Sequence, residues 1–268
     1  FLGYYYYLGR KQQSEGPQEV NVYPSDRIGP ITMAAAVGGI LGAKFFAIIE
    51  YLPRFFEDPL GVLLSGDGLA IYGGLIGGAL AVFLYLRRFK ISMLPVMDAV
   101  APSLIVAYGV GRMGCQFSGD GDWGIVAKPQ PDWWFLPDWV WSYDFPHNVL
   151  RRGVDIAGCE VEYCQRLAEA VYPTSVYETC IAFALGGLLW ALRKRLTPIP
   201  GLLFCIYLVL NGIERFFIEF IRVNDRYDVL GFALSQAQII AICFMVTGLG
   251  LGWFFWRRAR PQVPRELE

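Results

Sequence analysis

The feature of this sequence that most limits its fold is a series of long apolar runs. An α-helix needs about 20 apolar residues to cross the roughly 30 Å hydrocarbon core of a bilayer, and the runs have about that length. Hydrophobic residues make up 55% of the chain and charged residues 18%, too little charge to cover a soluble protein of this size. The sequence therefore predicts an all-α fold, a polytopic bundle of membrane helices.

The runs predict about seven transmembrane helices. Residues 1–8 are expected to be the end of a first span. The others are expected at residues 28–51, 68–86, 95–110, 176–192, 201–221 and 234–256. Residues 1–268 would then form a single transmembrane domain, with residues 115–175 as a small insertion that caps its outer face.

The basic residues predict how the bundle is oriented. If the spans alternate in direction, four basic clusters fall on one side, which their positive charge marks as the cytoplasm. They are Arg10-Lys11, Arg87-Arg88-Lys90, Arg193-Lys194-Arg195 and Arg257-Arg258-Arg260. The C-terminus is then cytoplasmic. Because these clusters flank apolar runs and form no patch, we expect membrane lipids as partners and no nucleic acid.

The expected outer segment is rich in tryptophan and contains one close pair of cysteines. Tryptophan prefers the headgroup region, so part of the segment is expected to lie along the outer leaflet. Cys159 and Cys164 lie on the oxidising side, where they could be joined or remain free thiols. The tryptophans are Trp123, Trp133, Trp134, Trp139 and Trp141.

Glycines in the third predicted span indicate close helix packing. Gly73 and Gly77, and likewise Gly74 and Gly78, have the G-x-x-x-G spacing that allows two helix backbones to approach. This arrangement is found in many bundles and does not by itself indicate a function.

Charged residues inside a bilayer are costly, so each one needs a reason. Arg112 precedes a run of glycines and small polar residues, where we expect the helix to break and to offer backbone N–H groups to an anion. Arg215, Glu219 and Arg222 have the spacing of one helix face. They could bind a ligand or form an ion-paired stripe between helices.

Two further observations concern the polar residues. Tyr177 and Glu178 follow a Pro-Thr-Ser helix start and are expected at the outer interface. The single histidine, His147, lies in no predicted span. An intramembrane Ser-His hydrolase and a histidine-rich metal site are therefore not expected.

At these residues the chain resembles the bacterial prolipoprotein diacylglyceryl transferase family. The matching segments, in order, are Gly73-Gly74-Leu75-Ile76-Gly77, Gly111-Arg112-Met113-Gly114 through Gly124, Tyr172-Pro173-Thr174-Ser175-Val176-Tyr177-Glu178, Gly212 through Arg222, and Ser235-Gln236-Ala237-Gln238. Several matches in one order are more specific than any single motif.

The resemblance implies an enzyme of the bacterial inner membrane with its active site toward the outer, periplasmic face. Such an enzyme transfers the diacylglyceryl group of phosphatidylglycerol to the lipobox cysteine of a preprolipoprotein, forming a thioether and releasing glycerol phosphate. The reaction needs charge stabilisation and a base, so no metal or organic cofactor is expected. The implied catalytic residues are Arg112, Arg215, Tyr72 and Glu219, with Arg112 and Arg215 as a phosphate clamp. The implied substrate-binding residues are Ser118, Asp120, Gly124, Tyr177, Glu178, Asn211, Arg222 and Gln238.

The chain departs from the family pattern at three places. Tyr72 and Tyr172 stand where the family has histidines, and Cys115 stands where it has an asparagine. A tyrosine with a pKa near ~10 is a poor base at neutral pH. A carboxylate such as Glu219 or Asp120 could instead activate the acceptor thiol.

Two other classes of function remain as alternatives. A non-catalytic descendant of the family could bind anionic phospholipid or lipoproteins, and the missing histidine favours it. A transporter or channel is expected to show inverted repeats and polar groups across the whole bilayer, whereas the polar groups here gather toward one face.

Overall fold

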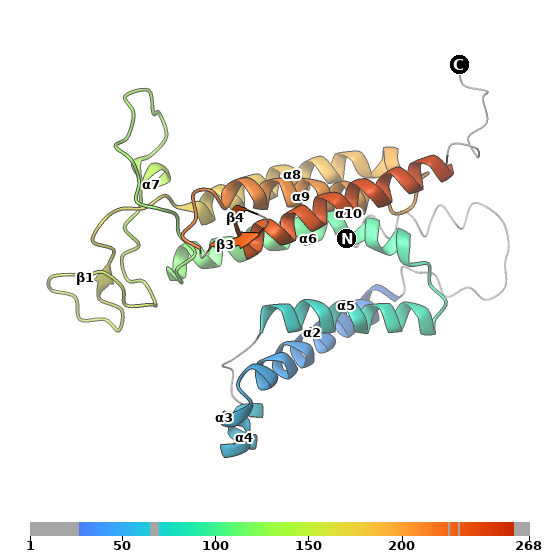
Figure 1. Cartoon of the computed structure of the whole chain (residues 1–268), viewed down its shortest axis with the longest axis horizontal. Coiled ribbons are helices and arrows are strands. Elements are labelled where there is room, and N and C mark those ends of the chain that lie inside the picture. Colours follow the sequence, from blue (N-terminus) through green and yellow to red (C-terminus); the bar gives the residue numbers. More distant parts are fainter. Residues whose placement is uncertain (1–26, 65–69, 225, 230, 260–268) are drawn as a thin grey trace. The chain divides into compact units, whose positions relative to one another are not determined.

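The computed structural model describes residues 27–64, 70–224, 226–229 and 231–259 (Figure 1). The predicted first span, residues 1–8, lies outside the described residues. The chain divides into two compact units, Phe1–Ala99 and Val100–Glu268. The boundary falls within helix α6, Met93–Ser118.

The first unit is built around two long helices. They are α2, Ile28–Glu50, and α5, Ile71–Arg88, with the short helices α3, Leu52–Glu57, and α4, Pro59–Leu64, between them in the sequence. Buried apolar side chains of α2 and α5 meet those of the start of α6. This apolar cluster includes Ile28, Ile31, Leu86, Val96 and Ala99.

Glycines bring α2 and α5 into backbone contact, as their spacing predicts. Gly38 and Gly42 of α2 face Gly73 and Gly77 of α5. A Cβ added to Gly77 would lie 2.7 Å from the Cα of Gly42. At this distance a side chain does not fit unless the backbone shifts. The G-x-x-x-G pattern of α5 is therefore matched by the same spacing on α2.

The second unit is a bundle of four long helices that lie alongside one another (Figure 1). They are α6, α8, Thr174–Leu196, α9, Leu202–Ile218, and α10, Gln236–Ala259. Ile105 of α6, Leu189 of α8 and Leu203 of α9 are buried in its core. The α10 helix begins with a capping box, in which Ser235 N–H donates to Gln238 Oε1 at 3.0 Å and Gln238 N–H donates to Ser235 Oγ at 3.2 Å.

Helix α6 does not break at Arg112, so that prediction is wrong. The helix continues through Gly111 and Gly114 to Ser118. The helix ends instead at Gly119, whose φ is 61°. The groups left free at this end of a helix are carbonyls, not N–H groups, so the expected backbone anion site is also wrong.

The segment between α6 and α8 is largely irregular and lies at one end of the four-helix bundle (Figure 1). It contains α7, Asp138–Trp141, and an antiparallel pair of strands, β1, Val154–Asp155, and β2, Gln165–Arg166. A disulfide joins Cys159 and Cys164. A second antiparallel pair, β3, Arg226–Val229, and β4, Phe232–Ser235, precedes α10. These short strands depart from the all-α prediction.

Four of the described helices, α2, α6, α8 and α10, are long and apolar enough to cross a membrane. With the apolar runs of the sequence they indicate a multi-pass membrane protein. Helix α9 has 17 residues and α5 has 18, and neither is among these four. The count of about seven spans and the capping role of residues 115–175 stay predictions.

Candidate active site

The centre of the charged site is Glu178, in the second turn of α8. The helix starts after Pro173, and Thr174, Ser175 and Glu178 of its first turns all point into the bundle, where they are fully buried. A buried carboxylate is stable only if donors satisfy its oxygens. The residues that satisfy Glu178 therefore define the site.

Glu178 forms ion pairs with three arginines and accepts a hydrogen bond from a tyrosine. Its Oε2 atom receives the Tyr108 hydroxyl, Arg112 Nε at 3.0 Å and Arg215 Nη1 at 3.4 Å. Its Oε1 atom receives Arg222 Nη1 at 3.0 Å. Tyr108 and Arg112 are one turn apart on α6, and Arg215 is near the end of α9. Three segments that are distant in the sequence thus converge on one carboxylate.

Asp122 is the second acid of the site and lies on the loop after α6. Its Oδ2 atom pairs with Arg112 Nη1, and its Oδ1 atom pairs with Arg222 Nη2. Burial acts to raise the pKa of Asp122, but Arg222 and Arg112 outweigh burial and hold the pKa below its usual range. The carboxylate is therefore an anion that bridges two cations.

Glu219 is the third acid. Its Oε2 atom is 3.5 Å from Arg215 Nη2 and 4.0 Å from Arg222 Nε, and Asn224 Nδ2 donates to its Oε1 atom. Helix α9 ends at Ile218, so Arg222 does not continue a helical face as its spacing predicted. The three side chains converge nonetheless, because the chain turns after the helix. Three arginines are thus balanced by Glu178, Asp122 and Glu219.

A fourth carboxylate, Glu214, is buried near these charges without hydrogen-bond donors among the described residues. It is close enough to interact electrostatically with Glu178, Arg215 and Arg112. Glu214 and Arg215 are adjacent in the sequence and have opposite charges. Because neighbouring residues on a helix point in different directions, the two side chains do not form an ion pair.

The structure brings five of the predicted site residues together in this cluster: Arg112, Glu178, Arg215, Glu219 and Arg222. Three other residues of the cluster, Tyr108, Asp122 and Glu214, are not among the predicted ones. Asp122 and Glu214 could have been found as acids inside the two arginine motifs. Tyr108 could have been found by its one-turn spacing from Arg112.

The remaining predicted residues lie around the cluster or away from it. Ser118 donates to Cys115 O at 3.4 Å, and Asp120 is exposed and accepts from Asp122 N–H at 3.3 Å. Asn211 is half-buried on α9, one turn before Arg215. Tyr72 lies on α5, in the first unit, and its side chain is exposed there. None of these contacts tests a role in binding or catalysis.

Three predicted substrate-binding residues make contacts that hold the main chain. Gly124 N–H donates to Tyr172 O at 2.9 Å, and a Cβ at Gly124 would lie 2.7 Å from Ile221 O. The Tyr177 hydroxyl donates to Val140 O at 2.7 Å. Gln238 belongs to the capping box of α10. The Gly124 contact holds the loop after α6, which carries Asp122, against the residues that precede α8.

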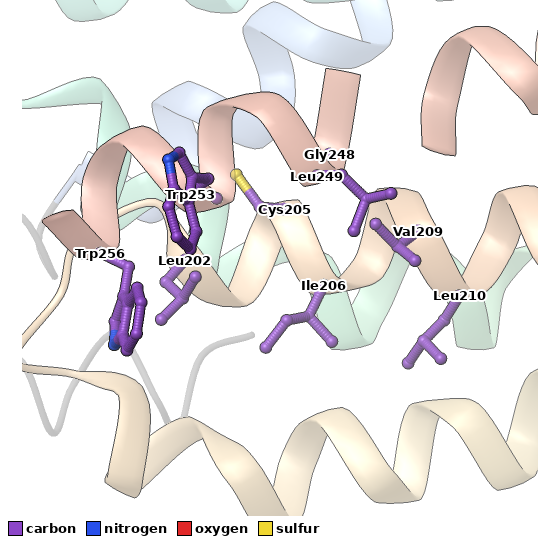
Figure 2. A pocket seen from close by; sticks show the side chains of 10 residues that line it. Leu202, Cys205, Ile206, Val209, Leu210, Gly248, Leu249, Trp253 and Trp256 are labelled. Atoms are coloured by element: carbon purple, nitrogen blue, oxygen red, sulfur yellow. The ribbon is translucent and has the colours of Figure 1, made fainter. Parts of the chain in front are cut away.

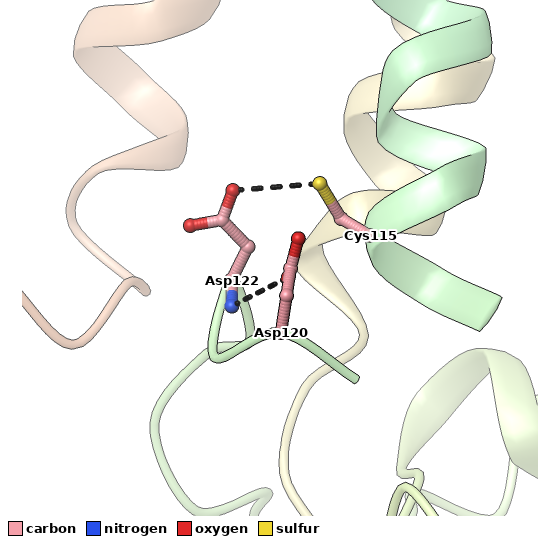
Figure 3. Close-up of side chains that lie close together, drawn as sticks. All are labelled: Cys115, Asp120 and Asp122. Carbon is pink, nitrogen blue, oxygen red and sulfur yellow. Dashed lines mark hydrogen bonds between the residues drawn. The ribbon is translucent and has the colours of Figure 1, made fainter. Parts of the chain in front are cut away.

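Cys115, Asp120 and Asp122 offer three ligand atoms within 4.8 Å of one another (Figure 3). Cys115 Sγ is 3.7 Å from Asp122 Oδ2, but Arg112 Nη1 pairs with that same oxygen and is 3.8 Å from the sulfur. A guanidinium group in this place disfavours a metal cation, because the two positive charges would repel each other. The expectation of no metal stays a prediction.

An apolar pocket of about 360 Å³ lies between α9 and α10 (Figure 2). Its wall includes Leu202, Ile206, Leu210, Trp253 and Trp256. No charged group of the cluster lines it, so it offers nothing that could bind a phosphate.

Comparisons with known proteins place this geometry in context. The family model described as prolipoprotein diacylglyceryl transferase matches residues 1–254. A phosphatidylglycerol–prolipoprotein diacylglyceryl transferase of Clostridium tetani is 29% identical over 85% of this chain and 80% of its own length. The phosphatidylglycerol–prolipoprotein diacylglyceryl transferase 2 of Clostridium perfringens is 30% identical over 85% of this chain and 78% of its own length. That of Staphylococcus carnosus is 28% identical over 96% of this chain and 84% of its own length.

Proposed function

The chain belongs to the prolipoprotein diacylglyceryl transferase family, and we propose that its arginine cluster is the active site of that transfer. The protein is a membrane-bound transferase of lipoprotein biosynthesis. Its substrates are phosphatidylglycerol and a prolipoprotein, whose cysteine thiol receives the diacylglyceryl group. Neither the relatives nor the charged cluster favours the non-catalytic alternative.

The observation that carries this proposal is the convergence of Arg112 and Arg215. Both guanidinium groups contact Glu178 Oε2, and both side chains remain partly exposed, Arg112 by 16% and Arg215 by 23%. Attack of the thiol on the glycerol carbon breaks the bond to the phosphate oxygen, which leaves with the electron pair. Fixed guanidinium groups stabilise that developing charge best where water is largely excluded.

Glu178 and Arg222 act as positioning residues in this proposal. Glu178 is fully buried beneath the arginines, and the Arg222 side chain is 5% exposed, so a lipid phosphate reaches neither of them first. Glu178 holds three guanidinium groups toward one point. Glu219 holds Arg215 from the other side.

We place the site at the outer face of the bacterial inner membrane, with the C-terminus in the cytoplasm. Arg112, Glu178 and Arg215 lie near the end of α6, the start of α8 and the end of α9. The basic residues of α8 and α10 lie in the last turns of those helices, Arg193, Lys194 and Arg195 in α8 and Arg257 and Arg258 in α10. Basic flanks favour the cytoplasm, so the charged cluster falls on the outer side. There it would meet secreted preprolipoproteins and their lipobox cysteine.

The proposal is tested by transfer of radiolabelled diacylglyceryl from phosphatidylglycerol to a synthetic lipobox peptide by purified protein. We expect a thioether-linked product with the wild-type chain, and a loss of at least about 100-fold in Arg112→Ala and in Arg215→Ala, as for other charge-stabilising groups. Arg166→Ala is the matched control, because Arg166 pairs with Asp144 at 3.2 Å on the exposed outer segment.

The outcomes separate the alternatives. Near-normal transfer in Arg112→Ala would remove Arg112 from the site. No product from the wild-type chain, with phosphatidylglycerol still bound, would instead favour the lipid-binding descendant.

A further inference from the structure

Asp122 is the more exposed partner in its ion pairs with Arg112 and Arg222. Its side chain is 33% exposed, whereas Arg112 is 16% and Arg222 5% exposed. Its two oxygens each take one guanidinium group, as two oxygens of a phosphate would. A lipid phosphate that binds Arg112 through Nη1 therefore competes with Asp122 for that donor.

The main chain at Asp122 is held independently of these ion pairs. The Thr174 hydroxyl donates to Asp122 O at 3.0 Å, and Asp122 N–H donates to Asp120 Oδ1 at 3.3 Å. Two residues on, Gly124 is tied to Tyr172. The Asp122 side chain can thus leave Arg112 by rotating about its own bonds, without a movement of the loop.

Exposure also separates Asp122 from the other acids of the site. Glu178 is fully buried, Glu219 is 2% exposed and Glu214 is 6% exposed. Among the described acids that contact the arginines, Asp122 is the one that a substrate thiol can reach. Asp120 is exposed as well, but its described contacts are with Asp122 N–H and Cys115.

We propose that the lipid phosphate displaces Asp122 from Arg112, and that the released carboxylate takes the proton of the acceptor thiol. This inference rests on the proposed transferase function. The thiolate then forms the S–C bond, the C–O bond to phosphate breaks, and its electron pair stays on the phosphate held by the arginines. When glycerol phosphate leaves, Asp122 returns its proton to water and pairs with Arg112 again.

Charge explains why the base would act only after lipid binds. In the resting protein Arg222 and Arg112 hold the pKa of Asp122 low despite its burial, so it is a weak base. Loss of Arg112 and the arrival of a phosphate anion both favour the protonated form, and so raise the pKa. Binding of one substrate thus prepares the group that activates the other.

The test is steady-state transfer by Asp122→Asn in mixed micelles, with the concentration of phosphatidylglycerol varied. The amide cannot compete as an anion, so KM for phosphatidylglycerol should fall several-fold. It cannot accept a proton, so kcat should fall about 100-fold or more. The deficit in kcat should shrink as the pH rises toward the thiol pKa of about 8.5, because thiolate then forms without a base.

Asp144→Asn is the matched control, since Asp144 pairs with the exposed Arg166, and it should leave both constants unchanged. Asp122→Ala should show the same fall in both KM and kcat, and it replaces Asp122→Asn if that variant does not accumulate. A KM that rises or stays constant would overturn the displacement, and a kcat deficit that is independent of pH would overturn the role as base. Absence of transfer by the wild-type chain would instead count against the proposed function itself.

Discussion

At the scale of single residues, stability should depend most on Glu178. Glu178→Gln leaves three guanidinium groups around a neutral amide in a buried site, where removal of one partner costs about 3–5 kcal/mol. We expect a large fall in the thermal unfolding midpoint of the detergent-solubilised protein, measured by tryptophan fluorescence.

Glu162→Gln is the matched control for that experiment. Glu162 pairs with Arg151 at 3.3 Å, but the two side chains are 67% and 58% exposed, so the pair contributes about 0–1 kcal/mol. Equal midpoints for the two variants would mean that Glu178 is not the anchor of the cluster.

The sequence predicts which residue types the site contains, but not which carboxylate pairs with which arginine. Asp120 and Asp122 lie in the same motif, and the sequence pattern predicted Asp120 as the site residue. The turn at Gly119 and Gly121, both with positive φ, directs Asp122 inward instead. Its partner Arg222 is 100 residues away, a separation over which local sequence pattern carries no information.

At the scale of elements, the apolar runs predicted the long described helices because period and length are local properties. The ends of the helices were predicted less well. Small polar residues after Arg112 suggested a break, yet α6 continues for six more residues to Ser118. The early end of α9 at Ile218 depends on where the loop from α6 crosses, with Ile125 N–H donating to Ile221 O at 2.8 Å.

The glycine contact between α2 and α5 leads to a prediction for these elements. In Gly77→Leu the new side chain meets the backbone of α2, including Gly42 Cα at 2.7 Å from its Cβ. Overpacking of this kind typically costs about 1–3 kcal/mol, so the unfolding midpoint should fall. Gly187→Ala on α8 is the control, because its Cβ would have open space and alanine favours a helix by about 1 kcal/mol. A midpoint that falls equally in both would refute the close contact.

At the scale of the whole molecule, the ends of the helices differ in charge. The last turns of α5, α8 and α10 carry basic residues, which also suit the negative end of the helix dipole. The opposite end of α8 carries Glu178 and its arginines. Within α8, the basic residues and the charged cluster therefore lie at opposite ends of one helix.

That division predicts the topology, which reporter fusions can measure. Green fluorescent protein fused after Lys90, Thr197 or Ala259 should fluoresce, because these positions follow basic helix ends and should face the cytoplasm. Alkaline phosphatase needs disulfides and is active only outside, so its fusion after Gly153 should be active, and the disulfide Cys159–Cys164 close by requires the same compartment. Phosphatase activity of a fusion after Thr197 would show that the protein has the opposite orientation in the membrane. The arginine cluster would then face the cytoplasm, where it could not meet a secreted prolipoprotein.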